Sequence, residues 1–306
     1  MAKARGRPGQ YVLANGRGGE IDPALPLSRA SWLVVAELQG RAAAPRILAA
    51  AEVSEEDVLA VLGREIETRQ VVEYDATSAS LRARETRRLG AIRLSERALP
   101  PPSGDAANRA INDAVRRHGL GILPWGREAM ALRSRLRWLR RGLGEPWPAT
   151  DDEALLEGLD DWLLPFLPGE PRMDGIPSKA IADGLMSLVP HDLQRRVDAL
   201  APTHFEAPTG SHVPIRYEGE APVIAIRVQE LFGLSRHPAI AGGTVPLLLE
   251  LLSPAHRPIQ VTRDLPGFWA GSWKDLRAEM RGRYPKHVWP DDPAATEPTR
   301  RAKPRG

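Results

Sequence analysis

Three consecutive prolines divide this sequence into two parts that are patterned differently. They stand in "LPPPSGD", Leu99 to Asp105. Proline fixes φ and lacks a backbone donor, so neither a helix nor an inner strand continues through such a stretch. Before it apolar residues mostly alternate, and after it they recur with helical spacing. We therefore expect a domain boundary at this point.

Residues 31–99 carry mainly strand patterns. One face of the stretch "EIETRQVVEYD" collects Ile66, Thr68, Gln70, Val72 and Tyr74. A single helix interrupts the strands, since Ser54 is a capping residue before "EEDVLAVLG" and Gly63 is a stop signal. Four or five strands with one inserted helix predict an oligonucleotide-binding-like β-barrel over residues 31–99, with residues 1–30 joining or starting it. Several other α+β folds share this element count.

Residues 103–201 are predicted to form a helical connector. One helix ends at Gly119, and the next contains "GREAMALRSRLRWLRRG". The apolar stripe of that second helix consists of Leu132, Leu136, Leu139 and Leu143.

Beyond the connector, residues 202–293 read as a mixed α/β C-terminal domain of several strands followed by one or two short helices. The domain ends in "RGRYPKHVWPDDP", in which Tyr284 and Trp289 are predicted to anchor an extended strap to the protein. Residues 294–306 are polar and predicted to form a disordered basic tail. The predicted fold class is thus α+β: a barrel, a helical middle segment and a mixed α/β domain.

The chain lacks the motifs of several catalytic and cofactor-binding classes. It has no cysteine, which excludes disulfides, thiolate catalysis and cysteine-based metal sites and fits a reducing cytoplasm. It has no G-x-x-x-x-G-K-[ST] phosphate loop, H-E-x-x-H motif or G-x-S-x-G elbow. His204 and His212 are expected to be structural or surface residues rather than metal ligands. We predict no catalytic, metal or cofactor site, and no signal peptide or membrane span.

The basic residues offer the remaining functional candidates. Only 5 of the 42 are lysine, a bias that a G+C-rich coding sequence explains, so the positions of the arginines matter more than their number. Two groups are predicted to contact nucleic-acid phosphates, one on a strand face and one on a helix face beside the leucine stripe. They are Arg82, Arg84 and Arg88, then Arg133, Arg137, Arg140 and Arg141. The alternative for both groups is a solvated surface, and Trp138 either packs against another element or stacks on a base.

Long strings of this sequence resemble the C-terminal accessory region of bacterial HrpB-type ATP-dependent helicases. They include "YVLANGRGGEIDPALPL", "LAPTHFEAPTGSHVPIRYEGEAPVIAIRVQELFGL" and "LRAEMRGRYPKHVWPDDP", and the match runs in order from about Tyr11 to the tail. The resemblance implies a piece of a DExH-type superfamily 2 helicase. ATP and Mg²⁺ are implied only for the motor domains, whose phosphate loop and DExH carboxylates are absent here. A misplaced gene start, a split gene or a stand-alone remnant would each explain this.

The resemblance also implies a function and partners. It favours single-stranded RNA or DNA as a ligand near Arg82, Arg84 and Arg88, and helicase motor domains as partners in cis or in trans. We therefore expect a non-catalytic, cytoplasmic accessory region, without ATPase activity of its own, that assists strand binding and docks on the motor. The alternative is a protein-interaction module that does not bind nucleic acid.

Overall fold

The computed structural model describes residues 1–40 and 45–301. They form two compact units. Unit 1 comprises Met1–Ala114 and Gly169–Gly175, and unit 2 comprises Val115–Pro168 and the described chain from Ile176. Within the described ranges no helix has both the length and the apolar character needed to cross a membrane.

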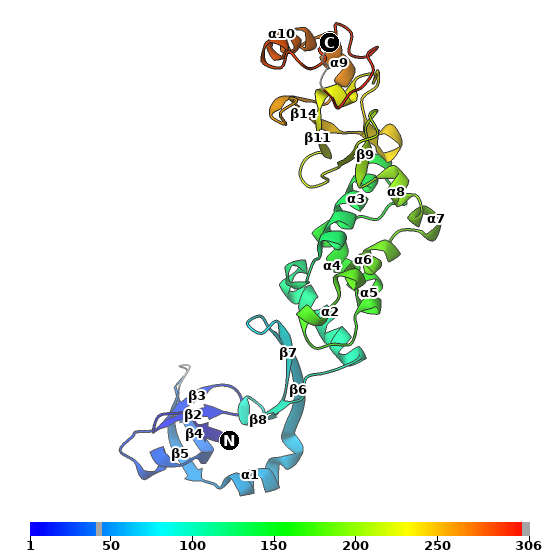
Figure 1. The fold of residues 1–306 in the computed structure, drawn as a ribbon. Coiled ribbons are helices and arrows are strands. Elements are labelled where there is room, and N and C mark those ends of the chain that lie inside the picture. Colours follow the sequence, from blue (N-terminus) through cyan, green and yellow to red (C-terminus); the bar gives the residue numbers. More distant parts are fainter. Residues whose placement is uncertain (41–44, 302–306) are drawn as a thin grey trace. The chain divides into compact units, whose positions relative to one another are not determined.

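Unit 1 begins with a closed five-stranded barrel of order β1-β2-β3-β5-β4 (Figure 1, blue). Its strands are β1 Ala2–Ala4, β2 Gln10–Leu13, β3 Gly18–Glu20, β4 Trp32–Gln39 and β5 Arg46–Glu52. Tyr11 and Leu33 lie in its core at 1% and 0% exposure. The Tyr11 hydroxyl lies 2.7 Å from the Leu27 carbonyl oxygen and 2.9 Å from that of Ala30, so the only polar atom of this buried ring is satisfied.

The helix predicted after the barrel strands is α1, Glu55–Leu62. The Ser54 hydroxyl accepts a hydrogen bond from the Asp57 amide at 3.1 Å, which satisfies one donor of the first turn. Gly63 is the C-terminal cap. Both ends therefore lie where the capping residues predicted them.

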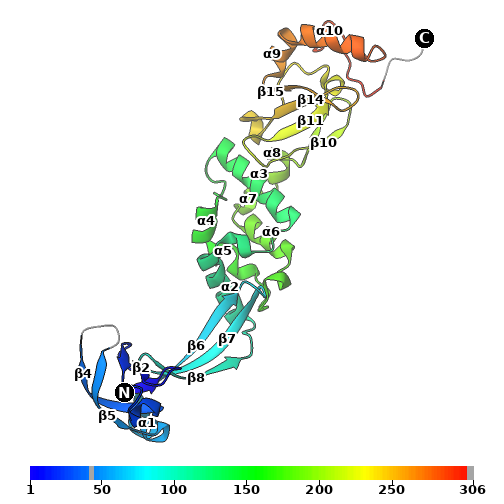
Figure 2. The same ribbon diagram turned by 90° about the vertical axis from the view of Figure 1, so that its left-hand side faces the viewer.

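The remaining strands of unit 1 form a separate antiparallel sheet of order β6-β7-β8 (Figure 2). They are β6 Ile66–Asp75, β7 Ser80–Leu89 and β8 Ile92–Leu99. Leu89 and Ile92 pack with Trp32 and Val58 at one end of the sheet. At the other end the Leu81 amide donates to the Pro171 carbonyl at 2.8 Å. The middle of the sheet is more open to solvent on both faces.

The barrel membership differs from the prediction. Barrel strands were expected within residues 31–99, with residues 1–30 joining or starting the barrel. The barrel takes its strands from residues 2–52, so the N-terminal segment does belong to it, whereas β6–β8 do not. Strands of three or four residues, such as β1 to β3, are too short to show an alternating pattern. The β6–β8 strands alternate, but both faces are polar midway, so they have no continuous apolar side with which to close a barrel. The predicted assignment of the barrel to the oligonucleotide-binding type stays a prediction.

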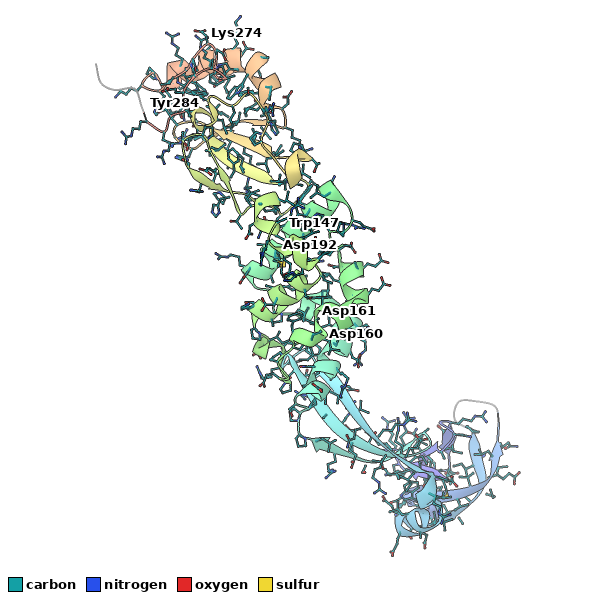
Figure 3. The ribbon with its side chains drawn as sticks, turned by 90° about the vertical axis from the view of Figure 1, so that its right-hand side faces the viewer. Trp147, Asp160, Asp161, Asp192, Lys274 and Tyr284 are labelled. Atoms are coloured by element: carbon teal, nitrogen blue, oxygen red, sulfur yellow. The ribbon has the colours of Figure 1, made fainter. Side chains whose placement is uncertain are left out.

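The central part of the chain is helical, as expected. Its helices are α2 Asp105–His118, α3 Arg127–Leu143, α4 Asp152–Glu157, α5 Leu159–Trp162, α6 Ser178–Ser187, α7 His191–Gln194 and α8 Val197–Leu200. Leu132, Leu136 and Leu139 of the predicted stripe are buried. Gly184 of α6 allows a close approach to α5, because a Cβ there would lie 2.1 Å from the Trp162 carbonyl oxygen. Asp160 and Asp161 occupy the first turn of α5 (Figure 3), where the helix dipole favours carboxylates.

The C-terminal part is mixed α/β, as predicted. Its strands are β9 His204–Glu206, β10 His212–Pro214, β11 Val223–Arg227, β12 Ala239–Ile240, β13 Val245–Pro246, β14 Leu248–Leu252 and β15 Pro258–Thr262. In the sheet β11-β14-β15, β14 is parallel to β11 and antiparallel to β15. The helices α9, Leu265–Ala270, and α10, Trp273–Arg283, follow.

The strap after α10 is held by an aromatic cluster. Trp289 is buried, its ring centroid lies 5.9 Å from that of Trp273, and its indole N–H donates to the Tyr284 carbonyl at 3.0 Å. Figure 3 shows Lys274 and Tyr284 near the two ends of α10. Trp289 is therefore the anchor that the sequence predicted. In the tail the Thr299 amide donates to the Gln229 carbonyl at 3.0 Å, and residues 302–306 of the predicted disordered tail lie outside the described residues.

Candidate nucleic-acid interface

The three strand arginines share one face of the β6–β8 sheet. Cross-strand partners point to the same side, and Arg82 pairs with Glu73, Arg84 with Val71 and Arg88 with Glu67. The opposite face carries the set that was predicted to lie together on one face of β6, which is Ile66, Thr68, Gln70, Val72 and Tyr74. The predicted facing of both sets is therefore confirmed.

Carboxylates on the same face pair with two of these arginines. Arg82 contacts Asp75, and Arg84 contacts Glu73 at 2.6 Å and Glu96 at 3.3 Å. The side chains of Arg82 and Arg84 remain 70% and 40% exposed. These side chains line a hollow of about 440 Å³ in the sheet face. The face is a mixed array of charges and not a purely basic one.

Arg88 differs from its two neighbours. It is exposed and, within the described ranges, forms no ion pair.

Over residues 66–99 seven arginines outnumber five carboxylates, which leaves the whole sheet with a net positive charge. Exposed ion pairs contribute only about 0–1 kcal/mol each, so a phosphate can exchange for a carboxylate here at small cost.

Asp75, the partner of Arg82, is stabilised in its ionised form. The pKa of Asp75 is lowered, chiefly by the hydrogen bond from the Ser78 hydroxyl, with the Thr77 amide and nearby Arg82 acting in the same direction. The Ser78 hydroxyl lies 2.8 Å from the Asp75 carboxylate. Asp75 thus stays available to pair with Arg82 at neutral pH.

The helix arginines have different partners. Arg133 donates to the Thr150 carbonyl at 2.8 Å, pairs with Asp152, and lies over the Trp125 ring at 5.2 Å. Its side chain is only 20% exposed. Arg133 was predicted to face either solvent or a phosphate, and it is instead packed within the protein.

Arg137 is exposed and Arg140 is half-buried, and both also donate to main-chain carbonyls. Arg137 lies 3.3 Å from the Tyr217 carbonyl oxygen, and Arg140 donates to the carbonyl of the buried Trp147 at 3.1 Å. Arg140 also contacts Glu145 at 3.3 Å. Main-chain carbonyls cannot move aside as carboxylate side chains can, so these arginines hold α3 against the loops around it.

Arg135 was missed by the sequence analysis, and it is the most buried of the group. Its side chain is 10% exposed, its Nε donates to the Ala201 carbonyl at 2.6 Å, and it pairs with Asp198. Its spacing was a usable signal, because it lies three residues after Leu132 and four before Leu139, on the side of the leucine stripe. An arginine at such a position needs a partner inside the fold.

Trp138 packs within the protein and is not free to stack on a base. It is 4% exposed, and its indole N–H donates to the Tyr217 carbonyl at 2.9 Å. The Arg141 guanidinium lies 4.9 Å from the centre of its ring. The packing alternative is therefore the correct one for Trp138.

Unit 2 contains a buried acid, Glu230. Burial raises the pKa of Glu230, but hydrogen bonds from Ser211, Arg227 and Thr209 outweigh it, so the net pKa is lowered. The Ser211 hydroxyl lies 2.5 Å and the Arg227 Nε 2.9 Å from its carboxylate. These hydrogen bonds join the loop before β10 to the segment after β11. Both carboxylate oxygens of Glu230 accept hydrogen bonds from within the protein.

The described residues do not fit a resident metal. Among them, no three histidine, aspartate or glutamate side chains gather closely enough to hold an ion.

Comparisons with known proteins agree with this architecture. Residues 162–293 match the family described as "ATP-dependent helicase C-terminal". The chain is 43% identical over 307 residues to the ATP-dependent RNA helicase HrpB of Escherichia coli strain K12, covering 99% of this chain and 38% of that protein. It therefore spans about two fifths of the length of this relative.

Solved structures give the same result. A crystal structure of the E. coli DExH-box NTPase HrpB matches with a TM-score of 0.65 at 43% identity, over 98% of this chain and 38% of that one. A crystal structure of the E. coli DEAH/RHA helicase HrpB matches with a TM-score of 0.57 at 38% identity, over 94% and 36%. The similarity thus extends over almost the entire chain.

Proposed function

We propose that this chain, which is similar to the C-terminal region of HrpB-type ATP-dependent helicases, assists such a helicase by binding single-stranded nucleic acid and docking on the motor domains. The motor domains hold ATP and Mg²⁺, and the present chain has no ATPase activity alone. A cysteine-free chain with these partners suits the cytoplasm.

The observation that carries strand binding is the β6–β8 sheet face. Arg82, Arg84 and Arg88 lie in line at alternate or near-alternate positions. Glu73, which pairs with Arg84, is an exposed side chain, and Asp75, which pairs with Arg82, is half-buried. Phosphates bind such guanidiniums through charge-assisted hydrogen bonds, and the arrangement reads no base edges. Binding should therefore depend on salt and little on sequence.

A second observation favours docking. Leu33 and Ile47 point into the barrel, so their neighbours Val34 and Leu48 face outward, and they are 45% and 48% exposed. Ala51 pairs with Val34 on the same outer face. An exposed apolar sheet face of this kind is typical of a surface that another protein covers.

Charge reversal separates strand binding from docking. We expect Arg82→Glu with Arg84→Glu to abolish binding of a fluorescent single-stranded RNA at low salt, measured by anisotropy, because two phosphate contacts become repulsive. Association with a separately produced motor region should be unchanged. Val34→Asp with Leu48→Asp is the matched variant, and it should weaken that association while RNA binding persists.

The reverse pattern would overturn the assignment. If charge reversal leaves RNA binding intact but disrupts assembly, the sheet is a protein-interaction surface. If the unmodified chain shows no affinity for single strands at low salt, the nucleic-acid part of the proposal fails and the interaction module remains.

A further inference from the structure

Unit 2 contains a pocket that none of the contacts above explains. It has a volume of about 300 Å³ and lies between the end of α3, the loop before β11, the β13 segment and the residue that follows β15. This volume is at the lower end for small-ligand sites. The pocket is lined chiefly by Trp138, Arg141, Glu220, Thr244 and Arg263.

Two arginines of this pocket are not committed to the fold. Arg141 and Arg263 are exposed, and over residues 1–40 and 45–301 neither guanidinium has a hydrogen-bond or ion-pair partner. Glu220 is the carboxylate among the lining residues, so the pocket carries a net positive charge. Arg133, Arg137 and Arg140 of the same helix, by contrast, all donate to main-chain carbonyls.

Arg141 is held in place without losing its donors. Its guanidinium carbon lies 4.9 Å from the centre of the Trp138 ring, and the hydrogen bond to the Tyr217 carbonyl fixes that ring. Because this cation–π contact is not a hydrogen bond to a polar acceptor, the guanidinium N–H groups stay available for bidentate binding of an oxyanion.

The end of α3 is also brought close to the opposite wall. A Cβ on Gly142 would lie 2.6 Å from a methyl group of Val245 and 2.8 Å from the Thr244 hydroxyl oxygen. Glycine is therefore required for the helix to approach β13 this closely. The approach places the neighbouring Arg141 at the pocket wall, where it and Arg263 both line the same space.

We propose that this pocket binds a backbone phosphate of single-stranded nucleic acid, with Arg141 and Arg263 as its contacts. The proposal rests on the strand-binding function proposed above and adds a second contact to it, in unit 2. The Trp138 ring is buried and covered by Arg141, so no aromatic face is free for a base. The pocket therefore recognises phosphate and not base identity.

The test is RNA binding by the full chain with Arg141→Ala and Arg263→Ala combined. We expect the affinity for a single-stranded RNA at low salt to fall on the order of tenfold and the slope of log affinity against log salt to become shallower by about 1.4, since each phosphate contact on a single strand contributes about 0.7. Arg127→Ala with Arg281→Ala is the control, because both residues are exposed and remove the same charge away from the pocket.

Arg263→Ala alone serves as the second variant, because it removes no contact within the described fold and should still reduce affinity. Unchanged affinity and slope in both pocket variants overturns this inference, and the sheet proposal stands if charge reversal at Arg82 and Arg84 still abolishes binding. Equal losses in the control and the pocket variants also overturn it, since charge alone would explain them. No binding by the unmodified chain overturns both proposals.

A labelled adenosine monophosphate distinguishes a strand from a free phosphate ester. We expect the chain to bind the strand much more tightly than this nucleotide. If the nucleotide binds as tightly as the strand and Arg263→Ala removes that binding, the pocket is a nucleotide site and the strand assignment is wrong.

Discussion

The arginines of the β6–β8 sheet and those of α3 are the same residue type with different partners. On the sheet, Arg84 meets the carboxylates of Glu73 and Glu96, which are themselves exposed side chains. On α3, Arg135 and Arg133 donate to main-chain carbonyls of Ala201 and Thr150. A carboxylate can turn away when a phosphate arrives, whereas a carbonyl fixed in the fold cannot. Whether an arginine is available for a ligand therefore depends on the kind of partner that it has in the fold.

The largest expected difference is in stability. Arg135→Ala should lower the free energy of unfolding of unit 2 by about 2–3 kcal/mol, because a buried charge-assisted hydrogen bond to the Ala201 carbonyl is lost. Arg84→Ala on the sheet should change stability by less than about 1 kcal/mol, because its partners are solvated. Urea unfolding followed by tryptophan fluorescence and circular dichroism measures both.

The control for this pair is Arg127→Ala, an exposed residue of the same helix, which should stay within about 0.5 kcal/mol of the unmodified chain. Equal stability of the Arg135 and Arg127 variants would show that the carbonyl partners do not hold α3, and the comparison between the two regions would fail.

An intermediate effect is expected at Glu230, the buried acid of unit 2. Glu230→Gln should cost about 1–2 kcal/mol at pH 7, because the carboxylate charge that strengthens the bond from Ser211 and the ion pair with Arg227 is lost. Its pKa is lowered in the folded state, so this stabilisation is fully present above its ordinary value of 4.5 and is lost as the pH falls through the lowered value. The variant should therefore lose less stability than the unmodified chain between pH 5 and pH 3. Parallel acid profiles of the two proteins contradict this.

The smallest expected effect sharpens the account of the sheet. Glu73→Gln removes a competitor for Arg84 while keeping the shape of the side chain. We expect the affinity for single-stranded RNA to rise about twofold. The gain is small because the exposed ion pair between Glu73 and Arg84, which a phosphate otherwise has to replace, is weak. Anisotropy titration at low salt measures it, with Glu85→Gln as a control that removes the same charge from the opposite face of the sheet, where Glu85 pairs with Arg97. A fall in affinity would mean that Glu73 positions Arg84 for binding.

The sequence predicted what short-range patterns determine. Ser54 and Gly63 mark the ends of α1, the leucine spacing predicts the buried side of α3, and alternation places Arg82 and Arg84 together. The partners of the α3 arginines were not predictable, since the Ala201 carbonyl lies 66 residues from Arg135 and appears in no local pattern. The exclusion of β6–β8 from the barrel was not predictable for a related reason, because the strands that close a barrel are decided by tertiary pairing and not by the periodicity of each strand.

The salt dependence of RNA binding tests the central claim most directly, comparing the unmodified chain with the Arg82→Ala, Arg84→Ala, Arg88→Ala triple variant. If the sheet arginines are the phosphate contacts, the slope of log affinity against log salt becomes shallower by about 2, with unit 1 still folded, since three contacts of about 0.7 each are lost. An unchanged slope would contradict the account and place the phosphate contacts elsewhere in the protein.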